Sequence, residues 1–131
     1  MSTLNVDALV GNTSANAITV RGEGTATTSL QQGLAKAWIS LVQDSSHSIN
    51  DSFNIGSIAD NGAGETTCNY ASVMGNSNYG VAIAEGNNQN RHLMYNANNT
   101  TRLKLEGWEH ASINSPTDCP HCGATVHGDL A

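Results

Sequence analysis

Two cysteines near the end of the chain are spaced for chemistry. Cys119 and Cys122 enclose Pro120 and His121, which gives the motif Cys-Pro-His-Cys. This motif resembles redox centres in which the first cysteine lies at a helix N-terminus, where the pKa of its thiol is lowered. Here a strand-forming pair, Thr125-Val126, follows in place of the long helix that a redox fold needs. We therefore do not expect redox catalysis.

The same cysteines could bind a metal. Cys119 and Cys122 form a thiolate pair with two intervening residues, His121 and His127 lie close by, and His110 lies upstream. Zinc takes four nitrogen or sulfur ligands. A zinc site could therefore form from the ligands of one chain or from ligands that several copies contribute. A disulfide between the two cysteines, and free thiols in a reducing cytoplasm, are the alternatives.

Other groups of residues give weaker indications of catalysis or metal binding. Asp44, Ser45 and His47 share one expected loop, but neighbours in sequence do not give the geometry of a hydrolase triad. The acidic residues show no spacing that selects two of them for glycan cleavage. The run Asp60 to Gly64 is expected to form a hairpin turn rather than a calcium loop. The sequence predicts a protein that is not an enzyme and needs no cofactor.

The elements that must position these residues are short strands. Cys68 and Tyr70 share one side of an expected strand, and Tyr79, Val81 and Ile83 share one side of another. Alternation at short intervals, separated by Gly and Asn, is typical of antiparallel β structure with one dry face. Cys68 is therefore expected in the core.

The rest of the chain follows the same pattern. Leu103 and Leu105 should point inward, and Trp38, inside an apolar run, should lie in the core. We expect an all-β fold, an antiparallel β-sandwich that is jelly-roll-like, with eight or so strands. The elements expected outside residues 51–84 are strands at 3–9, 16–21, 35–42, 91–95, 101–106 and 122–126, a helical turn at 29–34 with Ser29 as its cap, and loops at 86–90 and 96–100.

Composition limits how the chain can be stabilised. Only 38% of the 131 residues are hydrophobic, 5% are aromatic and 12% are charged. The first third cannot bury a core alone, since a pair of small strands in water is marginal. We therefore expect an N-terminal oligomerisation and attachment segment at 1–33, joined to a β-sandwich at 34–131, with copies of the chain sharing apolar surface.

Charge and hydropathy exclude several partners. The formal net charge is −6 and the basic residues are scattered, so binding to nucleic acid is not expected. No run of 18 apolar residues is present, so membrane insertion is not expected. The first residues lack the pattern of a secretory signal, so we expect synthesis in a cytoplasm.

Recognition residues can be predicted from residue type. Trp108 follows Gly107 and is flanked by charge, so it could stack on a sugar ring. Polar loops on a rigid scaffold carry recognition. The loop residues expected to contact a ligand are Asn87, Asn88, Asn98 and Asn99.

Four segments in order resemble one family. They are MSTLNVDALVGNTSANAITV, LQQGLAKAWISL, DSFNIGSIADNGAGETTCNYASVMGNSNYGVA and VHGDLA. This set is similar to short tail-fibre-like virion proteins of marine tailed bacteriophages. It departs from them at Met74 to Ser77, where such proteins often carry a proline, and at the Cys-Pro-His-Cys motif.

The resemblance implies a non-enzymatic virion component that forms a homotrimer. It also implies an N-terminal segment that intertwines or attaches to other virion proteins and a β-sandwich that faces solvent and the host. A glycan on the host surface is the ligand expected from the residue type of Trp108. A capsid decoration protein is the first alternative. A redox or zinc protein that uses the Cys-Pro-His-Cys motif is the second.

Overall fold

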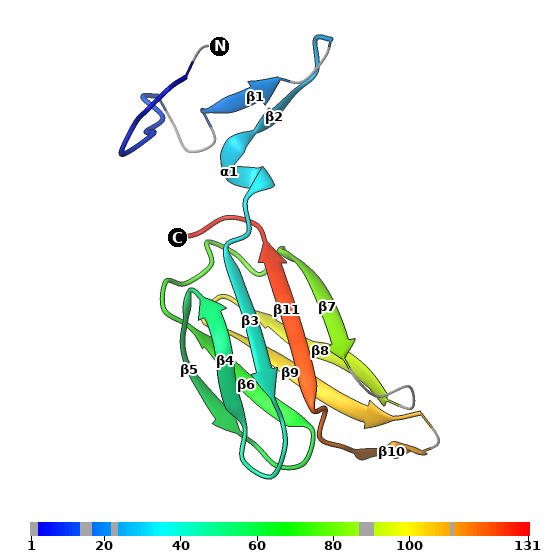
Figure 1. Ribbon diagram of the computed structural model, residues 1–131. Helices are drawn as coiled ribbons and strands as arrows, with labels where there is room; N and C mark the ends of the chain where they lie inside the picture. The colour runs from blue at the N-terminus through cyan, green and yellow to red at the C-terminus, as the bar shows by residue number, and fades with distance from the viewer. Residues whose placement is uncertain (1–2, 14–16, 22–23, 87–90, 111) are drawn as a thin grey trace. The chain divides into compact units, whose positions relative to one another are not determined.

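The computed structural model describes residues 3–13, 17–21, 24–86, 91–110 and 112–131. The chain divides into two compact units, Met1–Leu34 and Ala35–Ala131 (Figure 1). Each unit is considered by itself.

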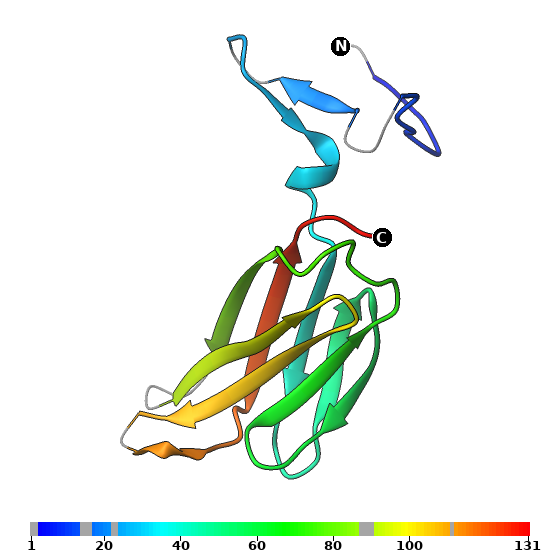
Figure 2. The same ribbon diagram turned by 180° about the vertical axis from the view of Figure 1, so that it is seen from behind.

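Two antiparallel sheets make up the second unit, as Figures 1 and 2 show from opposite sides. The architecture is mostly β and consistent with a β-sandwich, which confirms the predicted class at this level. The four-stranded sheet has the order β4 (Ser48–Phe53), β3 (Ala37–Val42), β11 (His121–His127) and β7 (Gly80–Gly86). The five-stranded sheet contains β5 (Ile55–Asp60), β6 (Glu65–Tyr70), β8 (Arg91–Asn99), β9 (Arg102–Glu109) and β10 (Ser112–Pro116).

Strand β9 organises the second sheet because it pairs with three others. Strand β8 pairs with it over most of its length, and β6 pairs with residues Arg102 to Glu106. Strand β10 pairs with the end of β9, at Trp108 and Glu109. Strand β9 therefore places Trp108 between β8 and β10, with His92 opposite it on one side and Pro116 on the other.

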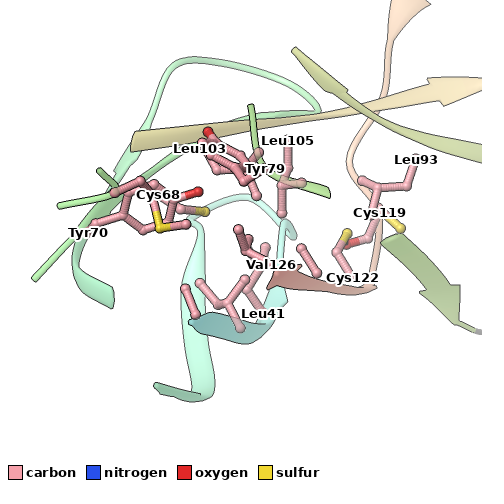
Figure 3. Packing of buried hydrophobic residues seen from close by; sticks show 14 residues of the cluster. Leu41, Cys68, Tyr70, Tyr79, Leu93, Leu103, Leu105, Cys119, Cys122 and Val126 are labelled. Carbon is pink, nitrogen blue, oxygen red and sulfur yellow. The ribbon is translucent and has the colours of Figure 1, made fainter. Parts of the chain in front are cut away.

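The core lies between the sheets and follows the alternation of strands β3, β6, β9 and β11 (Figure 3). In β3, Ala37, Ile39 and Leu41 are buried while the residues between them are half-buried. Leu103 and Leu105 of β9 are buried as predicted, and so is Cys68. The other buried apolar residues are Tyr70, Met74, Tyr79, Leu93, Cys119, Cys122, Ala124 and Val126. Sulfur-containing residues thus fill much of a core that is poor in large aliphatic groups.

Several sequence-based predictions were wrong. Trp38 alternates with the buried residues of β3, so it lies on the opposite face of the sheet and not in the core. The described residues 3–13 contain no strand, because no neighbouring strand pairs with their backbone. The loop expected at 96–100 is mostly strand, since β8 continues to Asn99 by pairing with β9.

A single residue carries the chain from one sheet to the other. Asn54 separates β4 from β5 and has a positive φ of 57°. Its Nδ2 donates to the carbonyl oxygens of Lys36 and Ser72, at 2.9 Å each, and its Oδ1 accepts from the Ser72 amide at 2.6 Å. Asparagine suits this position because it tolerates the left-handed region and its amide ties together three segments.

The first unit is small and open. Strand β1 (Thr19–Arg21) pairs antiparallel with β2 (Thr27–Ser29), and the single-turn helix α1 (Leu30–Gly33) follows. The Ser29 side chain accepts from the Gln32 amide at 3.4 Å, which confirms the predicted helix cap. No residue described between 3 and 34 is buried.

We predict that Asn54→Ala lowers the free energy of unfolding by about 2–4 kcal/mol, because three hydrogen bonds are lost at roughly 1 kcal/mol each and the positive φ is kept. Asn54→Gly should recover about 1 kcal/mol of this loss, since glycine adopts the left-handed region without strain. Urea denaturation measures both. Asn50→Ala, an exposed amide on β4 with one long hydrogen bond of 3.5 Å, is the control and should change little. Equal losses of unfolding free energy in Asn54→Ala and Asn50→Ala would show that the hydrogen bonds of Asn54 do not stabilise the fold as proposed.

Candidate functional site

One half-buried tryptophan faces outward from the five-stranded sheet. Leu103 and Leu105 of β9 point into the core, so Trp108 belongs to the opposite face by alternation. In the neighbouring strand β8, His92 lies opposite Trp108. A hollow of about 520 Å³ is lined by His92, Leu93, Met94 and Trp108. The cavity lined by these four residues is called the Trp108 hollow, and it is a candidate site for a ligand.

Charged groups lie next to the hollow on the same face. Lys104 Nζ is 3.0 Å from both Glu65 Oε2 and Glu106 Oε1. Asn96 Nδ2 donates to Glu106 Oε1 at 3.1 Å. Burial alone would raise the pKa of Glu106, but hydrogen bonds from Lys104 and Asn96 outweigh it and lower that pKa. Hydrogen bonds to Glu65 and Glu106 raise the pKa of Lys104. At neutral pH this part of the face is therefore a fixed set of charges beside an aromatic ring.

Two exposed histidines meet at the end of the same strands. His110 Nδ1 lies 2.7 Å from His92 Nε2, and the rings are 4.7 Å apart at 70°. His92 comes from β8 and His110 from the turn after β9. The antiparallel pairing of β8 and β9 brings them together across 17 intervening residues.

The Cys-Pro-His-Cys motif lies at the start of β11, and its two thiols are free and buried. Cys122 Sγ donates to the Cys119 carbonyl at 3.3 Å. A hydrogen bond from Cys122 lowers the pKa of Cys119, while the same bond and burial raise the pKa of Cys122. Burial raises the pKa of Cys68 to about 12. Cys119 is therefore the thiol best able to form a thiolate.

A buried glutamine holds this motif against the other sheet. Gln43 Oε1 accepts from the Cys119 amide at 3.1 Å and from Cys122 Sγ at 3.5 Å. Its Nε2 donates to the Gly64 carbonyl at 3.0 Å and to Thr66 Oγ1 at 2.9 Å. Gln43 is fully buried, so its polar atoms would be costly without hydrogen-bond partners. These hydrogen bonds supply the partners.

The histidines predicted as zinc ligands do not join the cysteines within one chain. His121 and His127 are exposed and lie at opposite ends of β11. Among the described residues, no three side chains of His, Cys, Asp or Glu gather closely enough to hold a metal. Zinc at Cys119 and Cys122 stays a prediction that would need ligands from another copy.

A Thr-His-Asp arrangement forms around His47, but with partners other than Asp44 and Ser45, its neighbours in the loop. His47 Nδ1 is 2.8 Å from Thr66 Oγ1, and His47 Nε2 is 3.6 Å from Oδ1 of both Asp60 and Asp118. Thr66 is fully buried and already accepts from Gln43, so a substrate cannot reach its hydroxyl. Asp118 Oδ1 also accepts from the Gly64 amide at 2.6 Å. We interpret this network as a structural link between the two sheets.

The amides predicted to contact a ligand are only partly placed. Asn87 and Asn88, and the side chain of Asn98, lie outside the described residues. Asn99 Oδ1 accepts from the Thr101 amide at 2.9 Å, and its backbone bonds the Tyr79 hydroxyl. Asn99 therefore shapes a turn, and its role in binding stays a prediction.

Sequence reasoning missed His92 and Met94 as neighbours of Trp108. The signal was present, because the alternation in Arg91–Tyr95 places His92 and Met94 on one face. The sequence alone does not give the register between β8 and β9, which places His92 opposite Trp108.

In the part of the chain that the structure describes, no helix is long and apolar enough to cross a membrane. Comparisons with protein-family models, with curated proteins and with solved structures found no match to this chain. The functional argument therefore depends on the residues themselves.

We predict that hydrogen peroxide, a reagent small enough to enter the core, converts Cys119 and Cys122 into a disulfide and leaves Cys68 reduced. The Cys119 thiolate attacks the peroxide and becomes a sulfenic acid with loss of hydroxide, and the Cys122 thiol then displaces water to form the disulfide. Counting thiols under denaturant should show a fall from three to one. Cys122→Ser should instead stop at a sulfenic acid on Cys119, which a sulfenic-acid-trapping reagent detects. Oxidation of Cys68, or no thiol loss, would contradict this assignment.

Proposed function

We propose that this chain is a non-enzymatic structural protein that assembles with copies of itself, in the manner of tail-fibre-like virion proteins. One observation carries the proposal: the first unit exposes its large aliphatic side chains. Their exposed fractions are 77% for Leu4, 56% for Val6, 55% for Leu9, 82% for Val10 and 52% for Val20.

Water makes this arrangement costly for a lone chain. Each aliphatic side chain that moves from water into an apolar contact contributes roughly 1.5–3 kcal/mol. A strand pair of three residues each and a single helical turn cannot supply that contact within one copy. Copies of the same segment can, because each offers the same apolar side chains. A homotrimer is proposed from the family resemblance.

The proposed contact with the host uses the Trp108 hollow. A half-buried indole beside fixed charges and imidazoles offers both a stacking surface and hydrogen-bonding groups for a surface glycan. Three such sites on one assembly bind more tightly than one, because the second and third contacts are intramolecular. A location in the virion, and contact with other virion proteins, belong to this proposal. The jelly-roll-like order of the strand connections stays a prediction. The proposed oligomerisation does not depend on it.

A capsid decoration protein is the first alternative, since such a protein would also be small, β-rich and oligomeric. Antibody labelling of particles distinguishes the two, because the label would mark the head in one case and the tail in the other. A redox or zinc protein is the second alternative. The pairing of the Cys119 and Cys122 thiols favours it, but Gln43 and burial hold both thiols away from large substrates.

We predict that the full chain has a native mass several times its monomer mass of 13.7 kDa. Leu4→Asp combined with Val10→Asp should give a folded monomer, because the charges prevent the apolar contact between copies. The control is Val73→Asp, which changes an exposed valine (41%) of the second unit and should leave the oligomer intact. Light scattering measures the mass. A monomeric full chain would contradict the proposal.

We predict that Trp108→Ala lowers binding to bacterial surface polysaccharides at least tenfold, or about 1.4 kcal/mol per site, because the stacking surface is lost. The measurement is an array of such polysaccharides probed with the labelled oligomer. Trp38→Ala, a half-buried tryptophan on the outer face of the other sheet, is the matched control and should retain binding. Equal losses from both variants would show that Trp108 has no particular role.

A further inference from the structure

We propose that His92 and His110 form a binding site for a divalent transition-metal ion, with Ni²⁺ or Cu²⁺ geometry preferred over zinc. The inference starts from one contact: His110 Nδ1 lies 2.7 Å from His92 Nε2. Two ring nitrogens that face each other at this distance share one proton when both rings are neutral. When the donating ring takes its other tautomer, its proton resides on the far ring nitrogen, and both facing nitrogens then offer lone pairs to a metal ion.

The spacing favours ligands at right angles around the ion. With metal–nitrogen bonds of about 2.0–2.1 Å, two neighbouring nitrogens are about 2.9 Å apart in a square-planar or octahedral site. A tetrahedral site separates them by about 3.4 Å. The observed 2.7 Å is close to the first value, so the rings need to part only slightly, and they must also turn so that both lone pairs point at the ion. Square-planar geometry is typical of Cu²⁺ and Ni²⁺.

The surroundings allow an ion to enter. Both histidines are exposed, and one comes from a strand and the other from a turn, so small adjustments of the rings meet little resistance. No third His, Cys, Asp or Glu of the described chain joins them, so the remaining positions belong to water or to an incoming ligand. The hydrogen bond alone contributes little to stability in water, because solvent competes for both rings.

This site differs from the cysteine motif predicted from the sequence. Cys119 and Cys122 are buried and bonded to Gln43, whereas the histidine pair is open to solvent. Neither site shares a residue with the other. The histidine pair also lies beside Trp108, since His92 is opposite Trp108 in the strand register and both line the same hollow. A bound Ni²⁺ ion, which has a partly filled d shell, should therefore quench the fluorescence of Trp108.

The test uses the full chain without a histidine tag, with NiCl₂ as the probe, because Cu²⁺ would oxidise the thiols. The Trp38→Phe background leaves Trp108 as the only tryptophan. We expect saturable quenching by Ni²⁺, together with binding heat at one ion per chain in calorimetry. His92→Ala and His110→Ala should each weaken binding at least about tenfold, since each removes one of two protein ligands. Zn²⁺ should bind more weakly than Ni²⁺.

The control is His121→Ala, an exposed histidine on β11, which should bind Ni²⁺ as the parent does. Circular dichroism of each variant confirms that the fold is kept. Unchanged Ni²⁺ binding in the His92→Ala, His110→Ala double variant would overturn the proposal. So would the absence of quenching at millimolar Ni²⁺, and tighter binding of Zn²⁺ would overturn the right-angled geometry. The oligomeric state plays no part in these outcomes, so they are independent of the proposed function.

Discussion

Among the described residues up to Leu34 no aliphatic side chain is buried, and the proposed assembly depends on this constraint. The second unit buries its own core, with Leu41, Leu103, Leu105 and Val126 closed between two sheets. The described residues of the first unit contain two three-residue strands and one helical turn, and Leu4, Val10 and Val20 are exposed. We propose that the same chemistry that folds the second unit acts between copies of the first.

The second unit compensates for a thin core with buried polar links. Gln43, which directly follows β3, connects the end of that strand to the cysteine motif and to β6, and Asn54 fixes the point at which the chain changes sheets. Cysteines and a methionine fill space that leucine or phenylalanine fills in many domains. Buried side-chain amides favour one arrangement of the surrounding segments, because any arrangement that leaves an amide without a hydrogen-bond partner is less stable. The outward faces are then free to carry Trp38 and Trp108, whose rings the core does not need.

Local alternation was enough to predict most strands and which of their residues point inward. Leu103, Leu105 and Cys68 were placed correctly because side chains alternate between the two faces of any strand, whichever strands pair with it. Trp38 was misplaced because an apolar run does not reveal which of its faces is dry. The strand expected at 3–9 failed for a related reason, since alternation predicts a strand only where another strand pairs with it. The contact between His92 and His110, and the four bonds of Gln43, depend on register and on segments far apart in sequence, which no local pattern contains.

The central claim is that the first unit is ordered by contact between copies, and hydrogen exchange tests it most directly. Amide exchange of Thr19–Arg21 and Thr27–Ser29 should be followed in the full chain at high and at very low protein concentration. The account predicts protection that disappears on dilution, while amides of β3, β9 and β11 stay protected at both concentrations. Protection of the first unit that is independent of concentration would contradict it, because a single copy would then hold that segment in place unaided.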